Sequence, residues 1–233
     1  MPIFERQSQS GSLLISFEVT DLVMAGWTGR DPAAVQHHID ELATLNVAPP
    51  SKTPLFYRLD PALLAGSVDQ ITVVGDSSSG EIEVVVLSMA DGLWVGLGSD
   101  HTDRAFEAHS VQLSKQLCRK PMAETLWSYD EVIDHWDEMI LRAHITEDGE
   151  RVLYQEGPLS EVQRPEDLIS AYLDARGSAV DDGLPVGTVI FCGALPAIGG
   201  IRPSTRFEMQ LEDPVRDERI DHVVDIKPLP TVN

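Results

Sequence analysis

The amino-acid sequence predicts an α+β fold, a β-rich mixed-sheet protein with a small N-terminal region. Many short apolar runs are separated by Gly, Pro, Asp and Ser, which is the pattern of strands joined by turns. Three segments have helical signals, but they do not alternate regularly with the strands as in a parallel α/β sheet. The 233 residues, of which 42% are hydrophobic, are enough for a sizeable core. We therefore divide the chain into an N-terminal strand–helix region, residues 1–60, and a β-rich domain, residues 61–233.

The N-terminal region is expected to hold strands and one helix. Residues 12–27 are typical of one or two strands, and residues 55–59 of a short apolar strand. Between them, Asp31 is a favourable N-cap and Pro32 occupies the first helical position, so a helix begins here. We expect this helix to end near Asn46, before a proline-rich loop.

The β-rich domain is expected to hold two more helices. One spans residues 104–117, and the other spans residues 165–176, with Gly177 just past its end. The other expected elements are a loop or short helix at 61–66, a segment at 71–80 that leads into a hairpin, a strand pair around a turn at 147–149, a buried strand with a glycine-rich loop in 184–200, and a final strand in 204–213.

The charge of the chain argues against two classes of partner. The chain has 38 acidic and 17 basic residues, a formal net charge of −21, spread along its length. Such a surface repels phosphate backbones and anionic lipids, so we expect neither nucleic acid nor a membrane as a partner. We also expect no transmembrane helix and no secretory signal. Two cysteines, Cys118 and Cys192, make no disulfide framework, which favours a cytoplasmic protein.

Acidic residues flank the apolar hairpin. Strand alternation places Glu81 and Glu83 on one face. If the Asp-Gly pair at 91–92 forms the two-residue turn, Glu83 lies opposite Asp100 and Glu81 lies opposite Thr102. Three carboxylates then converge, and oxygen ligands of this kind suit a hard cation such as Mg²⁺, Mn²⁺ or Ca²⁺. The alternative is an exposed hairpin whose acidic face is simply solvated.

Three segments resemble motifs of the fumarylacetoacetate hydrolase superfamily. Residues 81–83 (EIE) match its E-x-E strand, and residues 99–104 (SDHTDR) match its Asn-Asp-x-Ser-x-Arg motif. Residues 186–200 (VGTVIFCGALPAIGG) match its strand that runs into a Thr-Gly-Thr-Pro loop. The motifs follow the family order and span about residues 37–212, most of the chain. The resemblance, to a bacterial branch of unassigned function, implies a β-roll in which residues 61–233 form the metal-binding catalytic domain.

The resemblance implies a metal centre. In the family, two Glu and one Asp bind a divalent cation, usually Mg²⁺ or Mn²⁺, and these roles carry over to Glu81, Glu83 and Asp100. The sequence departs from the family in three places. Asp100 follows Glu83 by only 17 residues, Ala194 replaces the loop threonine that helps to hold substrate, and Ser99 replaces Asn. The short hairpin accounts for the first departure.

The resemblance also implies catalytic residues. The family's H-x-x-E dyad, in which Glu orients a His that activates water, matches His38 and Glu41 on a lid helix in the N-terminal region. Helical periodicity favours His38 over His37, because His38 borders the expected apolar stripe and His37 faces solvent. Lys115, or alternatively Lys120, matches the family's substrate-contacting lysine. The expected substrate-binding residues are Arg104, Thr102 and Gly193.

These residues indicate a metal-dependent hydrolase or lyase that cleaves a C–C bond in a small anionic oxo (1,3-dicarbonyl) acid. A 2-oxo acid decarboxylase, isomerase or dehydratase that uses the same metal is the alternative among enzymes. A non-catalytic, metal-stabilised binding protein is a third hypothesis, since Ala194 removes a hydroxyl from the substrate loop. The resemblance also leads us to expect a homodimer.

Overall fold

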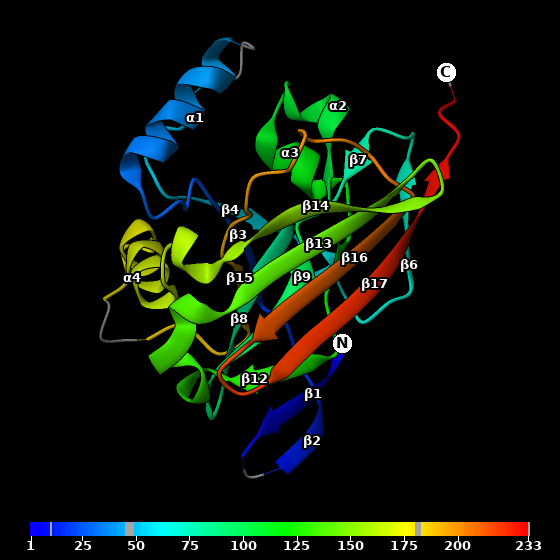
Figure 1. Cartoon of the computed structure of the whole chain (residues 1–233). Helices are drawn as coiled ribbons and strands as arrows, with labels where there is room; N and C mark the ends of the chain where they lie inside the picture. The colour runs from blue at the N-terminus through cyan, green and yellow to red at the C-terminus, as the bar shows by residue number, and fades with distance from the viewer. Residues whose placement is uncertain (10, 45–48, 180–182, 233) are drawn as a thin grey trace.

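The computed structural model describes residues 1–9, 11–44, 49–179 and 183–232, except for the side chains at positions 37, 38 and 41–44 (Figure 1). No helix in these ranges is long and apolar enough to cross a membrane.

Among these residues, the larger sheet has eight strands in the order β2-β1-β12-β9-β8-β15-β3-β4. Its strands are β1 (Ile3–Ser8), β2 (Gly11–Ser16), β3 (Asp21–Gly26), β4 (Leu55–Leu59), β8 (Ile82–Met89), β9 (Gly92–Ser99), β12 (Thr125–Ser128) and β15 (Thr188–Phe191). The pairs β1–β12 and β15–β3 are parallel, and the other pairs are antiparallel. Strands β1–β4 share this sheet with strands of the second region, and the boundary at residue 60 stays a prediction.

The smaller sheet of the described chain has five strands in the order β14-β13-β16-β17-β6. Its strands are β6 (Gln70–Val74), β13 (Ile140–Glu147), β14 (Glu150–Pro158), β16 (Arg206–Asp213) and β17 (Glu218–Leu229). Figure 1 shows this sheet across the larger one, where β13 contacts β8 and β16 contacts β9. The prediction of a β-rich mixed-sheet α+β fold is confirmed.

Strand β8 lies at the centre of the core, because both of its faces are covered. Val84 and Val86 belong to the apolar cluster between the two sheets. Val85 and Leu87 belong to a second cluster on the opposite face of the larger sheet. Every residue of β8 is therefore buried, including Glu83.

Two of the predicted helices are confirmed, the N-terminal one at its start and the one at 165–176 over its whole length. In α1 (Pro32–Thr44), the Asp31 side chain accepts a hydrogen bond from the Ala33 N–H at 2.9 Å, as an N-cap does. The predicted end near Asn46 lies outside the described residues. Helix α4 (Pro165–Arg176) ends at Gly177, whose φ of 70° is the left-handed conformation that favours glycine.

The single helix predicted for residues 104–117 is wrong. The segment forms two short helices, α2 (Arg104–Glu107) and α3 (Val111–Gln116). Between them, Ser110 is extended and its hydroxyl accepts a hydrogen bond from the Leu113 N–H at 3.3 Å. A serine that caps a helix in this way interrupts the preceding one.

Short elements complete the fold. They are the two-stranded pairs β7 (Ser78–Ser79) with β10 (Thr102–Asp103) and β5 (Leu64–Gly66) with β11 (Lys120–Pro121), and the 3₁₀ turns η1 (Pro61–Leu63), η2 (Tyr129–Glu131), η3 (Ile133–Glu138) and η4 (Leu159–Glu161).

Candidate metal centre

The β8–β9 hairpin turns one residue earlier than predicted. Its turn is at residues 90–91, and Met89 pairs with Gly92, the first residue of β9. Gly92 has a φ of 130°, so the glycine is needed just after the turn instead of within it. The Asp91 carboxylate accepts a hydrogen bond from the Trp94 indole N–H at 3.3 Å, which fixes Asp91 in the turn.

The predicted pairing of the carboxylates is therefore wrong, although the three still share a face. Asp100 lies opposite Glu81, and its backbone N–H donates to the Glu81 carbonyl at 2.9 Å. Glu83 lies opposite Gly98, which has no side chain to compete for the space. Relative to the predicted register, each partner moves by two positions. Because side chains alternate with a period of two, this shift leaves every side chain on its predicted face.

The three carboxylates converge on one point. One oxygen each from Glu81, Glu83 and Asp100 lies within 4.8 Å of the others. Glu83 and Asp100 are 2% and 1% exposed, whereas 20% of the Glu81 side chain is exposed, so the cluster opens on the Glu81 side. Oxygen donors at this spacing fit a hard divalent cation such as Mg²⁺ or Mn²⁺, which retains positions for water or substrate. We refer to Glu81, Glu83 and Asp100 as the carboxylate triad.

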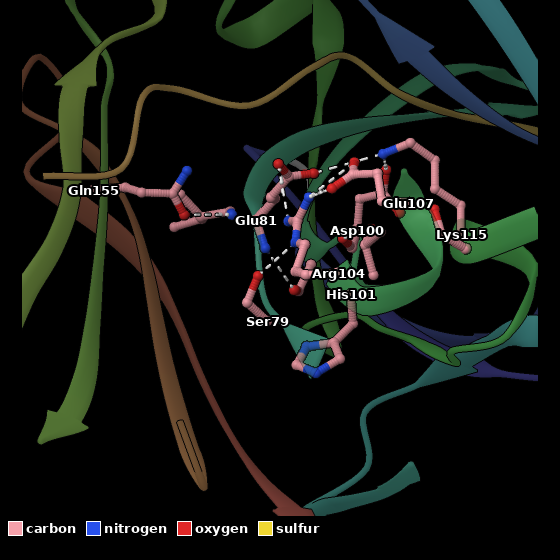
Figure 2. Close-up of polar contacts among 12 residues, drawn as sticks. Ser79, Glu81, Asp100, His101, Arg104, Glu107, Lys115 and Gln155 are labelled. Carbon is pink, nitrogen blue, oxygen red and sulfur yellow. Dashed lines mark hydrogen bonds and ion pairs between the residues drawn. The ribbon is translucent and has the colours of Figure 1, made fainter. Parts of the chain in front are cut away.

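In the described chain, three basic side chains contact the triad. Lys115 Nζ lies 2.5 Å from Asp100 Oδ2 and 3.5 Å from Glu81 Oε2. Lys120 Nζ lies 2.7 Å from Asp100 Oδ1. Arg104 Nη2 lies 3.0 Å from Glu81 Oε1. Figure 2 shows Arg104 and Lys115 pointing toward Glu81 and Asp100. Buried carboxylates need such partners, because burial without them is costly.

The chain that follows β9 positions these cations. Asp103 caps α2 by accepting a hydrogen bond from the Phe106 N–H at 3.0 Å, so the chain turns directly after Asp100. Arg104 is the first residue of α2, and Lys115 lies on α3 beyond the break at Ser110. The interruption of the helix thus permits both cations to reach the triad.

Burial and charge separate the pKa values of the triad. Burial raises the pKa of Glu83, and the neighbouring Asp100 charge raises it further, so it lies well above its ordinary value. Burial would raise the pKa of Asp100 too, but the charges of Lys115 and Lys120 outweigh it and hold this pKa well below the usual range. The pKa of Glu81 is lowered because basic neighbours likewise outweigh its burial. Glu83 is therefore the carboxylate whose ionisation depends most on an added cation.

The loop after β15 holds Glu83 in place. The Gly193 N–H donates to Glu83 Oε2 at 2.7 Å. Gly193 has a φ of 104°, and a Cβ there would lie 1.7 Å from Thr28 Oγ1, so only glycine fits. Gly193 is buried and its N–H is engaged by Glu83. Its expected contact with substrate stays a prediction.

Arg104 and Thr102 were predicted to bind substrate. The Arg104 Nε–H donates to Ser79 Oγ at 2.7 Å while its Nη2 faces the triad. Thr102 pairs with Ser79 and not, as predicted, with Glu81. Thr102 is fully buried, and its hydroxyl donates to the Asp100 carbonyl at 2.9 Å. The substrate contacts of both residues stay predictions.

The predicted dyad falls on α1. His38 and Glu41 belong to this helix, but their side chains, like that of His37, lie outside the described residues. Val35 and Ile39, from the expected apolar stripe, are half-buried. Figure 1 shows α1 standing apart from the two sheets. The dyad therefore stays a prediction.

Sequence reasoning missed two features of the site. Lys120 was an alternative to Lys115, whereas both side chains contact Asp100. Tyr57, on β4, was not considered at all, yet its ring centroid lies 6.0 Å from Lys115 Nζ. No motif marks Tyr57, because it reaches the site only through the pairing of β4 with β3.

The sequence matches a known protein family. Residues 25–223 match the family described as "Protein of unknown function (DUF2848)". No curated protein matches the chain.

Solved structures share the fold. The 2-keto-3-deoxy-D-arabinonate dehydratase complexed with magnesium and 2,5-dioxopentanoate has a TM-score of 0.64 and 16% identity, over 97% of this chain and 79% of that chain. The 4-oxalocrotonate decarboxylase from Pseudomonas putida G7, complexed with magnesium and adipate, has a TM-score of 0.58 and 15% identity, over 88% of this chain and 76% of that chain. The 5-carboxymethyl-2-hydroxymuconate delta-isomerase from Mycobacterium smegmatis has a TM-score of 0.60 and 14% identity, over 99% of this chain and 100% of that chain. The chain thus belongs to the DUF2848 family and has the fold of the fumarylacetoacetate hydrolase superfamily.

Proposed function

We propose that this protein is a divalent-metal-dependent enzyme that acts on a small anionic oxo acid. The observation that carries the proposal is the carboxylate triad, whose oxygens converge within 4.8 Å beside two lysines and an arginine. Mg²⁺ or Mn²⁺ would be held by Glu81, Glu83 and Asp100. The magnesium in two of the similar structures supports this choice of ligand.

The residues around the triad have separate tasks in this proposal. A bound cation supplies Lewis-acid polarisation of adjacent carbonyl and carboxylate oxygens. Gly193 fixes Glu83, and Lys120 fixes Asp100, each through a contact of 2.7 Å. Lys115 and Arg104 lie on the partly exposed Glu81 side, where they bind the substrate carboxylate and stabilise developing negative charge.

The reaction proposed first is hydrolytic cleavage of a C–C bond in a 1,3-dicarbonyl acid. His38, oriented by Glu41, takes a proton from water on an imidazole nitrogen, and the resulting hydroxyl adds to the distal carbonyl carbon. The C–C bond breaks, its electron pair moves to the 2-oxo fragment, and the proton on His38 completes that product.

A second candidate is dehydration, decarboxylation or isomerisation of a 2-oxo acid at the same triad. The similar dehydratase, decarboxylase and isomerase favour it. A decarboxylase needs no activated water, so the two candidates differ in their dependence on His38. Replacement of His38 by Ala should disable the hydrolase and leave a decarboxylase largely active.

A panel of acylpyruvates and 2-oxo acids tests the function. Loss of enol absorbance is followed with Mg²⁺, with Mn²⁺ and with chelator, and products are identified. We expect metal-dependent turnover that Asp100→Asn abolishes. Asp213→Asn is the matched control, because Asp213 is fully buried but pairs with His135 at 2.8 Å. Stabilisation by Mg²⁺ without turnover of any compound would instead indicate a binding protein.

The oligomeric state is a separate expectation. We propose the homodimer that the resemblance implies, and light scattering after gel filtration measures it. A monomeric mass that remains fully active would refute this part alone.

A further inference from the structure

Trp27 has an unusual backbone conformation close to the triad. It follows β3 and has a φ of 61°, the left-handed region that a bulky residue rarely adopts. The next residue, Thr28, is 4% exposed, and its side chain packs against Gly193, whose N–H holds Glu83. The strained turn at Trp27 therefore packs, through Thr28, against the Gly193 loop that positions Glu83. Strain of this kind persists where the surroundings enforce it, often at functional sites.

Tyr57 lies next to this turn. It pairs with Met24 on β3, and its ring covers Gly26, where a Cβ would lie 3.0 Å from Tyr57 Cε2. Lys115 Nζ lies 6.0 Å from the ring centroid and 2.5 Å from Asp100 Oδ2. The phenol is half-buried. The Lys115 ammonium therefore lies between the Tyr57 ring and Asp100 of the triad.

The Tyr57 hydroxyl can act as a hydrogen-bond donor. Burial raises the pKa of Tyr57, so the phenol keeps its proton at neutral pH. The Tyr57 hydroxyl can therefore donate a hydrogen bond to a substrate oxygen.

We propose that Tyr57 is a further substrate-binding residue, whose hydroxyl donates a hydrogen bond to a substrate oxygen. This inference rests on the proposed function, since it places an oxo acid at the triad. It also assigns a residue to the second oxygen of the 1,3-dicarbonyl acid proposed above. The triad metal and Lys115 suffice for the 2-oxo acid end, so Tyr57 selects acids with an additional oxygen, such as a second oxo or hydroxyl group.

Two probes separate these contributions. Pyruvate carries only the 2-oxo acid end, and 2,4-dioxopentanoate adds one oxo group. Their dissociation constants, or the KM where a compound is turned over, are measured in excess Mg²⁺. We expect Tyr57→Phe to weaken 2,4-dioxopentanoate about 10-fold, the effect of one lost hydrogen bond. Pyruvate affinity should change less than about 2-fold, because the hydroxyl makes no contact with it.

Tyr172→Phe is the matched control. Tyr172 is a buried phenol that packs on Phe56, the neighbour of Tyr57, and accepts a hydrogen bond from Arg176. It should change neither affinity. Unchanged affinity of Tyr57→Phe for both probes, with a Mg²⁺-induced rise in melting temperature retained, overturns this inference alone. A parent protein that shows no such rise and binds neither probe refutes the proposed function and this inference together.

Discussion

Replacement of Glu83 by Gln should stabilise the metal-free protein while it destroys metal binding. Glu83 is 2% exposed and lies within 4.8 Å of two other carboxylates. At an effective dielectric constant of about 20, two unit charges at that separation repel by about 3 kcal/mol. Gln keeps an oxygen that can accept from the Gly193 N–H, so the 2.7 Å hydrogen bond survives. The attraction of Lys115 for Glu83 is lost, and offsets part of the gain.

We expect Glu83→Gln to raise the free energy of unfolding of the metal-free protein by about 1–3 kcal/mol at mildly alkaline pH. For a chain of this length, this stabilisation corresponds to a rise in melting temperature of about 2–12 °C. The pKa of Glu83 is raised by burial and by Asp100, so the fold favours the neutral acid. The stability that this preference contributes is complete below the ordinary pKa of Glu and is lost as the pH rises through the raised value. The advantage of Gln should therefore grow with pH.

Thermal melts in chelator and in excess Mg²⁺ give the answer. The free energy of unfolding of the parent should rise by about 3 kcal/mol when Mg²⁺ reaches about 100 times its dissociation constant, and that of Glu83→Gln should not change. Glu156→Gln, on the surface beside Arg142, is the control and should behave as the parent. If Glu83→Gln melts below the parent in chelator at every pH, protein donors satisfy the carboxylate and the triad is no metal site.

Three further predictions concern single side chains. His38→Ala should lower turnover about 10²–10⁴-fold and His37→Ala should be nearly silent, as steady-state assays would show, and equal effects would mean that the helix face is misassigned. The Lys115 ammonium occupies Asp100 Oδ2 and competes with the cation, so Lys115→Met should tighten Mg²⁺ binding about 10-fold or more in a calorimetric titration. The same variant should lower turnover. Weaker Mg²⁺ binding would refute this competition. Gly193→Ala should destabilise the protein by about 2 kcal/mol or more in denaturant melts, because its Cβ would overlap Thr28, and an unchanged midpoint would contradict the packing described.

The sequence was sufficient to predict the face of the triad but not its register. Alternation along β8 and β9 assigns Glu81, Glu83 and Asp100 to one face in either register. The position of the turn depends on Asp91, whose hydrogen bond with Trp94 depends on folded geometry. A local turn preference for Asp-Gly could not anticipate this contact.

The cations show a second limit. A helix through residues 104–117 was a reasonable prediction from local pattern, but Ser110 caps a new helix and redirects the chain. That break decides where Lys115 lies. The contact of Lys120 with Asp100 comes through β11, whose partner β5 lies far away in the sequence. Such long-range pairings leave no signal at the spacing of a motif.

Strand β17 was missed for a different reason. Its buried residues Ile220, Val224 and Ile226 are separated by charged side chains, which conceal the apolar face in the sequence. Its neighbours β16 and β6 supply the hydrophobic surface against which those few residues pack. A polar strand of this kind becomes stable only through its sheet partners.

Charge balance at the triad leads to a last prediction, that metal and substrate bind cooperatively. Without metal, burial favours the neutral acid of Glu83, and the negative charges of Glu81 and Asp100 are more than balanced by the positive charges of Lys115, Lys120 and Arg104. A divalent cation adds two positive charges to a site that is largely buried, and an anionic oxo acid removes part of that excess.

Each ligand should therefore raise the affinity for the other by the same factor, about 5–150-fold for a typical coupling free energy. Calorimetric titration of Mg²⁺ with and without saturating pyruvate, and the converse titration, measures the factor twice. Lys115→Met removes one of the positive charges that the substrate offsets, so the coupling should become weaker in that variant. In the parent, the Arg142 guanidinium pairs with Glu156 and Glu212, away from the triad, so the Arg142→Met variant should keep the parental factor. If pyruvate leaves the Mg²⁺ affinity of the parent unchanged, the two ligands do not share this site and the charge argument is wrong.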